Sequence, residues 1–590
     1  MPTDNVGNLS FEQIFKPNIR FEIPFFQRGY AWEKKQWDQL FTDIKEQILE
    51  DADTLLAVEN NEHFFGPIVV LGKENTDPTL QRFMVIDGQQ RITTIYLLLA
   101  LIKNELEKKV HDSHEASGYV NILNNLIEND SSGDDDYKKL KVFSSKGDRL
   151  PTFKTIFEIN PRSPILTADV ELYNPETNNV DRFRRYVEKR LPKDFPSVPD
   201  LWKLCTALLK SLKIVWIPLK EGKDDPQAIF ESLNDRGMPL SAAELLCNYI
   251  FKPLIDENEN FEDLHNNKWL KSIRTTEGEH GFEEYLRILF SIGQKKVIGK
   301  GRKVYTYYKN SHKPLSSNMA RTTIDDISSS LPSYNVIMNP FKHKNKSPQI
   351  NEQLIKINNT RMEACYTYIL AILKYNNLGK LDTTIAVDLL KETLILLVRR
   401  KYGEMSTTKY DTIFPNLLNR IISEPNPVLA MQDFIKKEGY WISDQEFREH
   451  IVNRPLYRER DLLFTRMILQ EVDKSLSTYG QLPDYTTLGS VEHVLPQTID
   501  EHWKVYLGND LNNTDLPRFS NTIGNLCLLS TPANSHAGRD PFESKKADYS
   551  DVSALTKDIK GRNVKWDISQ IKLRSEFLCT KLLEIYAWKV

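Results

Sequence analysis

The sequence predicts a multidomain α+β protein, and three observations lead to this fold class. The chain has 590 residues, and single hydrophobic cores stop growing near ~250–300 residues. Apolar strand-like runs alternate with helical periodicity in the first part of the chain, whereas residues 255–440 show mostly helical periodicity. A separate strand, loop, strand and helix pattern follows near the C-terminus. We therefore expect three domains, at residues 1–254, 255–440 and 441–590.

Composition excludes several classes of protein. Hydrophobic residues make up 40% of the chain and charged residues 27%, which is ordinary for a soluble globular protein. The longest apolar run, Ile95 to Ile102, is too short to cross a bilayer, and the N-terminus lacks a signal-peptide pattern. The five cysteines show no CxxC spacing, which disfavours both a disulfide framework and structural zinc. We expect a cytoplasmic protein without membrane contacts.

The net charge of −3 argues against a protein that coats nucleic acid, because such proteins usually present a basic surface. Any contact with DNA must therefore be local. Each basic cluster could supply such a contact or could simply be a solvated loop or helix end. These clusters are Lys295, Lys296, Lys300, Arg302 and Lys303; Lys342, Lys344 and Lys346; and Arg399, Arg400 and Lys401.

The N-terminal part of the chain offers a first phosphate-binding candidate. A strand ending near Pro24 is followed by an aromatic-rich turn that contains Gln27 and Arg28, and then by an amphipathic helix from Trp37 to Ile48. A guanidinium held by aromatic neighbours is suited to bidentate contact with a phosphate. The alternative is that these aromatic residues only anchor a loop to the core.

A second candidate lies between a strand at Phe83–Ile86 and a helix at Ile92–Leu106. The turn Asp87-Gly88-Gln89-Gln90-Arg91 stands where free backbone N–H groups and the helix dipole favour an anion. Its glycine allows the backbone to approach a ligand closely. An ordinary polar turn with a helix cap is the alternative, and no GxxxxGK[ST] motif is present, so this would not be a P-loop.

Three segments in series, IPFFQRGYAW, FFGPIVV and VIDGQQRITTIYLLLA, resemble the ParB/sulfiredoxin-like N-terminal domain of the GmrSD-type restriction proteins. The segment IFESLNDRGMPLSAAELLCNYIF at 229–251 matches the end of that domain. The resemblance implies a nucleoside triphosphate site with hydrolysis assisted by a divalent ion. Capping and turn formation alone would also explain the 229–251 segment. The implied nucleotide-binding residues are Gln27, Arg28, Asp87, Gly88, Gln89, Gln90, Arg91 and Asn234.

Residues 491–546 carry the chemistry of the C-terminal domain. We expect one strand around Val491 to Leu495, another at Leu526 to Leu529, and a turn into a helix from Asn534. A histidine near neutral pH can take a proton from water, and carboxylate and amide oxygens are the ligands that a hard divalent cation prefers. Such a cation stabilises charge on a scissile phosphate.

The motifs EHVLPQ, GNLCLL and PFESKK in this order resemble the HNH, or His-Me finger, nucleases with a ββα-metal fold. The resemblance implies that His493 is the general base, that Glu492 and Asn534 bind the metal, and that Asn525 orients the loop that carries the histidine. It also implies that Lys545 or Lys546 faces a phosphate. His536 is a rival base or ligand, Asp is commoner than Glu at the first position, and the alternative for the Glu-His pair is a surface pair or a satisfied core histidine.

Together these motifs predict a nucleotide-dependent DNA endonuclease of the type IV restriction class, acting against phage on modified DNA. The expected cofactors are Mg²⁺ or Mn²⁺ and a nucleoside triphosphate, with NTPase activity. The expected partner is DNA, and a homodimer is the assembly considered. The helical middle would link the two active modules. The rival functions are a nucleotide-switched DNA-binding protein with an idle nuclease and a toxin-like nuclease that attacks host nucleic acid.

Overall fold

A computed structural model describes residues 5–588, except 25–26, 51–53, 74–79, 131–135, 159–173, 221–228, 230–239, 257–260, 277–278, 478–481, 509–515, 550–552 and 564. The chain divides into two compact units, Met1–Phe261 and Glu262–Val590. The first boundary lies close to the one expected at 254, and the second unit contains both the helical middle and the C-terminal region. None of the described helices is long and apolar enough to span a membrane.

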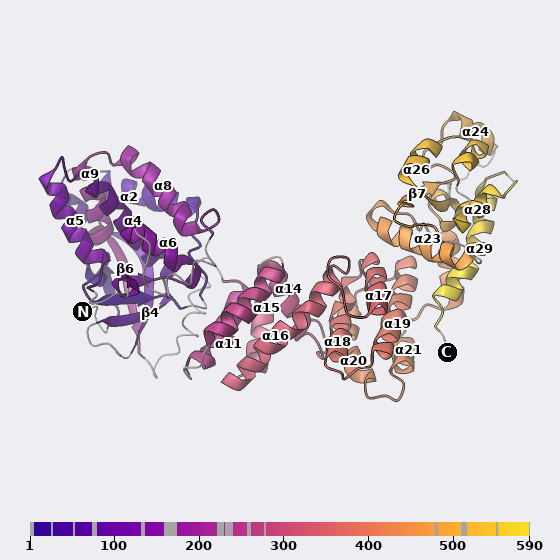
Figure 1. The fold of residues 1–590 in the computed structure, drawn as a ribbon, viewed down its shortest axis with the longest axis horizontal. Helices are drawn as coiled ribbons and strands as arrows, with labels where there is room; N and C mark the ends of the chain where they lie inside the picture. The colour runs from indigo at the N-terminus through magenta and orange to yellow at the C-terminus, as the bar shows by residue number, and fades with distance from the viewer. Residues whose placement is uncertain are drawn as a thin grey trace. The chain divides into compact units, whose positions relative to one another are not determined.

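The first unit is built on a six-stranded mixed sheet (Figure 1) with the order β1-β6-β3-β4-β2-β5. Strand β4 pairs in parallel with β2 and antiparallel with β3, and β3 pairs in parallel with β6. The strands rich in Val, Ile and Phe suit these buried positions. Their bounds are β1 Gly7–Ser10, β2 Ile19–Glu22, β3 His63–Gly72, β4 Gln81–Asp87, β5 Val142–Phe143 and β6 Leu212–Leu219.

Helix α4 (Gln89–Glu107) is the central helix of this unit, because every residue from Ile92 to Leu106 is buried. A helix that is apolar on most of its faces has to be covered on several sides, and α4 contacts α5, α6, α8 and α9. The helix follows β4 through Gly88 alone. The other helices of the unit include α2 Lys34–Ile44, α3 Leu55–Asn60, α5 His114–Ile127, α6 Lys146–Phe157, α8 Asn179–Asp194, α9 Val198–Thr206 and α11 Ala242–Asp256.

The sequence prediction for this unit is confirmed at the level of a mixed α/β sheet followed by a largely helical remainder. The strands expected at 64–72 and 83–86 are β3 and β4, and the helix expected at 92–106 is α4, which begins earlier, at Gln89. Asn234, predicted to contact the nucleotide, lies outside the described residues.

The second unit begins with a helical region and ends with a small antiparallel strand pair surrounded by helices (Figure 1). The helical region comprises α14 Glu279–Phe290, α15 Arg302–Ser311, α16 Ser317–Met338, α17 Pro348–Asn359, α18 Tyr366–Asn377, α19 Thr383–Tyr402, α20 Tyr410–Ile421 and α21 Pro427–Lys437. The rest contains α22 Asp444–Asn453, α23 Leu462–Leu476, β7 Ser490–His493, α24 Glu501–Leu507, α25 Leu516–Ser520, β8 Leu526–Leu529, α26 Thr531–Ala537, α27 Phe542–Lys545, α28 Ala554–Lys560 and α29 Ile568–Ile585.

The basic end of α19 joins these two parts and does not face solvent. Arg399 is fully buried and donates to the carbonyls of Ile442 and Tyr586 at 2.9 Å each. Arg400 is 6% exposed and donates to the Tyr440 carbonyl at 2.9 Å. A guanidinium has five donors, so it can tie several carbonyls together. The interpretation of this cluster as a DNA contact or a solvated helix end is therefore wrong for both arginines.

Candidate active site

The strand pair β7–β8 followed by α26 positions the residues that the sequence singled out. Glu492 lies opposite Cys527 and His493 opposite Leu526 in the antiparallel register. Because side chains alternate along a strand, Glu492 and His493 point to opposite faces of the pair. Glu492 faces inward with 3% exposure, whereas His493 ends the strand and is half-buried.

The ring of His493 is fixed by a second asparagine. Its Nε2 lies 3.1 Å from Oδ1 of Asn521, and Nδ2 of Asn521 donates to the Pro517 carbonyl at 3.0 Å. A carbonyl only accepts, so the amide must turn its oxygen toward the imidazole. Gln497 donates to the same oxygen at 2.8 Å. Nε2 therefore carries the proton of the neutral ring, and Nδ1 keeps its lone pair.

Burial keeps this imidazole neutral. The pKa of His493 is lowered to about 4, chiefly by desolvation and further by the nearby Lys545 ammonium, while the hydrogen bond to Asn521 opposes both effects. The ring of Tyr457 packs edge-on against the imidazole, with centroids 4.5 Å apart. No described residue hydrogen-bonds to Nδ1 of His493. A neutral histidine with an unpaired ring nitrogen is a competent proton acceptor at neutral pH.

Asn525 braces the backbone that follows His493. Its Oδ1 accepts from the Leu495 N–H at 2.8 Å and from Nε1 of Trp566 at 3.0 Å, and its Nδ2 donates to the carbonyls of Leu495 and Ser520 at 2.8 and 2.7 Å. The side chain is fully buried. An amide whose hydrogen-bonding groups are all satisfied in the interior acts as a rigid link between loops.

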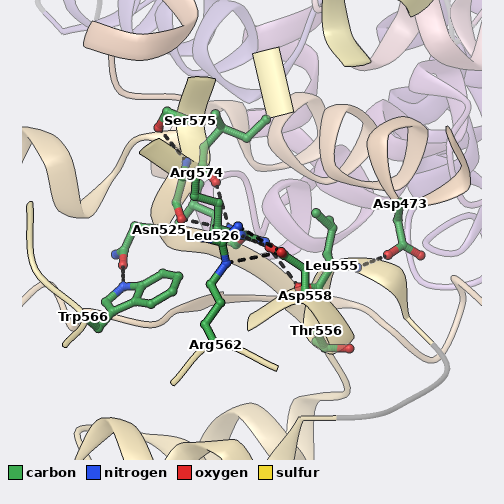
Figure 2. A network of polar contacts seen from close by, with 12 residues as sticks. Asp473, Asn525, Leu526, Leu555, Thr556, Asp558, Arg562, Trp566, Arg574 and Ser575 are labelled. Carbon is green, nitrogen blue, oxygen red and sulfur yellow. Dashed lines mark hydrogen bonds and ion pairs between the residues drawn. The ribbon is translucent and has the colours of Figure 1, made fainter. Parts of the chain in front are cut away.

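Residues of helix α29 hold the start of β8, and Figure 2 shows Arg574 and Ser575 beside Asn525 and Leu526. Arg574 is fully buried and donates to the carbonyls of Gly524 and Leu526 at 2.8 and 2.9 Å, and its Nε pairs with Asp558 at 2.8 Å. Gly524 packs so closely on α29 that an added Cβ would stand 2.0 Å from the Ile571 carbonyl. The start of β8 is thus immobilised on both sides.

Glu492 and Lys545 form a buried ion pair, with Nζ 2.8 Å from Oε1. Nζ also donates to the His493 carbonyl at 2.9 Å, and the Tyr549 hydroxyl donates to Oε1 of Glu492 at 3.2 Å. Burial raises the pKa of Glu492, and Lys545 is the largest opposing influence. Lys545 is fully buried, so its ammonium lies against the carboxylate and the strand end in this structure.

Asn534 lies on helix α26, on the face of β7 that Glu492 also occupies. Its Nδ2 donates to Oγ of Ser490 at 2.7 Å, and Ser490 is two residues before Glu492. Its buried Oδ1 has no hydrogen-bond partner among the described residues. Carboxylate and amide oxygens are ligands suited to a hard divalent cation, and the unpartnered Oδ1 of Asn534 is the observation here that suits one.

The alternative site residues, His536 and Lys546, make their contacts outside this site. His536 is largely exposed and pairs with Asp548 through Nδ1 at 2.8 Å, which raises the pKa of His536. Lys546 donates to the Arg562 carbonyl at 2.7 Å and pairs with Glu543 at 3.1 Å. Among the described residues, neither His536 nor Lys546 contacts His493, Glu492 or Asn534.

In the first unit, the predicted nucleotide turn forms the junction between β4 and α4. Gly88 adopts φ +91°, and an added Cβ would stand 2.9 Å from the Pro67 carbonyl oxygen. Arg91 donates through Nη2 to that carbonyl at 2.6 Å and to Asp87 at 3.0 Å. The glycine is therefore required for packing against β3, and the arginine clamps the turn to the same strand.

The glutamines of the turn hold the segment 27–32 in place. Gln90 accepts from the Ala31 N–H at 2.8 Å and donates to the Gly29 carbonyl at 3.2 Å. Gln27 donates to the Val85 and Ile86 carbonyls, both at 3.1 Å. Gln89 donates to the Arg28 carbonyl at 3.0 Å, and its buried Oε1 has no partner among the described residues.

The guanidinium of Arg28 approaches the start of α11, where its Nε lies 4.0 Å from Oε1 of Glu244. Both side chains are mostly covered, with 19% and 10% exposure. Gln27, Arg28 and the turn at 87–91 thus lie close together. Gln89 Oε1, which has no partner among the described residues, and the uncapped helix start are the features there that suit a polar, anionic ligand.

Two known protein families match the sequence, one over each of the regions that hold the candidate sites. The description GmrSD restriction endonuclease, N-terminal domain, matches residues 11–251, and GmrSD restriction endonucleases, C-terminal domain, matches residues 441–581. The chain belongs to the GmrSD restriction endonuclease family. No curated protein matches the sequence. As a GmrSD protein the chain is a nuclease whose substrate is DNA, and endonucleases of this family typically depend on a metal ion.

Sequence reasoning missed some residues of the GmrSD C-terminal site. Asn521, Tyr457 and Tyr549 contact His493 or Glu492, yet none was proposed. Asn521 stands four residues before Asn525, and this spacing offered the one usable signal. Tyr457 lies 36 residues before His493, so only the fold reveals it, whereas Tyr549 stands four residues after Lys545 and its role could not be read from spacing alone.

Proposed function

We propose that this GmrSD protein is a divalent-metal-dependent DNA endonuclease in which His493 is the general base. The observation that carries the proposal is the hydrogen bond from Nε2 of His493 to Asn521, which leaves Nδ1 as the unprotonated nitrogen. The low pKa of the ring, about 4, keeps Nδ1 unprotonated at neutral pH. General bases of this kind contribute roughly 10²–10⁴-fold to a rate.

The chain's own residues divide the work. His493 accepts the proton of the attacking water at Nδ1, and Asn521 stabilises the imidazolium that results by accepting from Nε2. Asn525 keeps the strand end and the following loop rigid. Glu492 and Asn534 would hold the metal, with Lys545 orienting the carboxylate. When bound, Mg²⁺ or Mn²⁺ would polarise the phosphate and stabilise the leaving oxygen.

We propose that the turn at 87–91, with Gln27 and Arg28, binds and hydrolyses a nucleoside triphosphate. The uncapped start of α4 offers backbone N–H groups to a phosphate, and Gln89 Oε1 offers an acceptor for a hydroxyl or amino group. Several side chains of the turn already bond to segment 27–32. A nucleotide that competes for these bonds would loosen that segment, which gives the site a means of signalling.

The expected role is type IV restriction, in which nucleotide binding in the first unit activates the cutting of modified phage DNA in the second.

A cleavage assay tests this role. Purified protein is incubated with unmodified and cytosine-modified phage genomes, with and without ATP or GTP and with Mg²⁺ or EDTA, and cleavage is followed on gels. We expect cutting only with Mg²⁺, stimulated by nucleotide and favouring modified DNA. Equal cutting in EDTA, or none under any condition, would refute the proposal.

A further inference from the structure

The helical region of the second unit contains a lysine-lined pocket of about 540 Å³. One wall comes from the segment Lys268–Thr275, another from α16, and the third from the turn that follows α16. The helices stand in the part of Figure 1 labelled α14 to α16. We call this hollow the lysine pocket, and its basic residues are Lys268, Lys271, Lys342, His343 and Lys344.

Among the described residues, the charge of the lysine pocket is only partly neutralised. No Asp or Glu is among its lining residues. At its edge Lys268 pairs with Asp325, and the adjacent Asp326 is occupied by Lys374 at 2.6 Å. Among the residues that the structure describes, no carboxylate pairs with Lys271, Lys342 or Lys344, which are all exposed. Like charges gathered around one hollow repel one another, so a polyanion that enters it is attracted strongly.

Neutral hydrogen-bonding groups also line the lysine pocket. Ser272, Thr275, Ser328 and Asn335 supply hydroxyl and amide donors on its walls. Phe341, immediately before the basic turn, is 63% exposed. Lysines with neutral donors and an exposed aromatic ring are the combination that grips a nucleic-acid backbone and packs on its sugars or bases.

The basic residues at the end of α19 and beside β7 are already bound within the protein. Arg399 and Arg400 bind internal carbonyls, and Lys401 pairs with Asp461 at 2.7 Å. Lys545 is buried against Glu492. With a net charge of −3 for the whole chain, attraction to DNA has to come from a local cluster.

We propose that the lysine pocket binds the phosphate backbone of the DNA duplex that the protein cuts. The helical region then has a binding role of its own, in addition to linking the two active modules. This inference rests on the proposed function for the identity of the ligand, but it concerns a different part of the chain from the His493 site.

The test is equilibrium binding of a fluorescein-labelled DNA duplex to the full chain in EDTA, measured by anisotropy at several salt concentrations. The variant Lys271→Gln/Lys342→Gln/Lys344→Gln is compared with Lys380→Gln/Lys409→Gln/Lys437→Gln, which removes the same charge from exposed lysines of the same helical region. Thermal unfolding checks that both variants remain folded.

Each phosphate contact adds about 0.9 to the salt slope, so the pocket variant should lose about 2–3 from the slope and bind roughly 10–100-fold more weakly. The control variant should lose much less. Equal losses in both variants, or an unchanged slope in the pocket variant, would overturn the inference. A His493→Ala chain should bind the duplex like the unaltered protein without cutting it, so failure of the nuclease and failure of the pocket give different results.

A second binding experiment tests whether the lysine pocket binds a free nucleotide in place of DNA. A fluorescent ATP analogue is titrated into the same proteins. We expect the pocket variant to bind the analogue as the unaltered chain does. Loss of nucleotide binding in this variant with duplex binding intact would contradict the assignment to DNA.

Discussion

The turn at 87–91 and the site at the end of β7 differ in how fully their polar side chains are hydrogen-bonded within the protein. At the turn 87–91 most polar side-chain groups bond to the protein, since Gln90 holds the segment 29–32 and Arg91 holds Asp87 and the Pro67 carbonyl. At the end of β7 the supporting residues are satisfied, but Nδ1 of His493 and Oδ1 of Asn534 are left without partners among the described residues. In the proposal above, the second site carries out the chemistry, and a ligand at the first site would exchange bonding partners with the protein, where Gln89 Oε1 is the one acceptor without a partner among the described residues.

We propose that this difference reflects a catalytic role for the second site and a regulatory role for the first. Catalytic groups work best when they are fixed before the substrate arrives, and Asn525 and Arg574 provide that rigidity around β8. A regulatory site instead needs a ligand that shifts an equilibrium between two sets of contacts. The predictions below test each half of this comparison, starting with the largest effect.

Replacing the proposed base should have the largest effect. His493→Ala should lower single-turnover DNA cutting by roughly 10²–10⁴-fold, because no other described group accepts the proton of water there. His536→Ala is the matched control, since this exposed histidine pairs with Asp548 and should leave cutting within about twofold. If both variants cut equally well, His493 is not the base.

Altering Asn521 should have the next largest effect, through the tautomer of His493. Asn521→Leu removes the acceptor at Nε2 and should lower kcat roughly 10–100-fold with little change in KM. Asn521→Asp keeps an acceptor but adds a negative charge, which favours the imidazolium and raises the pKa of His493. The acid limb of its pH–rate profile should therefore move upward. Profiles identical to that of the unaltered protein would remove Asn521 from the mechanism.

A substitution in the turn at 87–91 should abolish the stimulation of DNA cutting by nucleotide. Asp87→Ala removes the carboxylate that holds Arg91 at 3.0 Å, so nucleotide should no longer change the cutting rate. Coupling between sites typically amounts to about 5–150-fold. Basal cutting without nucleotide is measured in parallel and should stay the same. Full stimulation in this variant would break the proposed link between the units.

Gly88 should contribute to stability. Gly88→Ala places a Cβ 2.9 Å from the Pro67 carbonyl oxygen at φ +91°, and we expect a loss of about 1–3 kcal/mol in the free energy of unfolding of the first unit. Gly72→Ala is the control, because an added Cβ there has no atom within 4 Å. Denaturant melts that match for the two variants would show that the turn tolerates a side chain.

Much of the fold was predictable, and the reason lies in local patterns. Apolar runs gave the strands β3, β4 and β8, and the apolar stretch after Arg91 gave the central helix. The turn between β4 and α4 was predictable because a glycine between an apolar strand pattern and a helical pattern is a strong turn signal in a sequence. The short helix that carries Asn534 begins at Thr531, before the expected start, because Ser530 caps it.

The candidate site was predictable only in part. His493, Glu492 and Asn534 follow motif spacing, but the burial of Lys545 depends on α27 packing against β7, which spacing does not report. The same holds for Arg399 and Arg400, whose basic run indicated an exposed helix end although both are buried by the C-terminal part of the chain. Long-range packing decides such positions, so a single sequence misjudges them.

The most direct test of the central claim is the protonation state of His493 itself. ¹⁵N NMR of protein labelled at the imidazole nitrogens of its 11 histidines, with His493→Ala to assign the signal, reports both tautomer and pKa. Because burial penalises the charged ring, the account predicts a neutral ring protonated at Nε2 that titrates near pH 4. A ring protonated at Nδ1, or one that titrates at its ordinary value near 6.5, would contradict it.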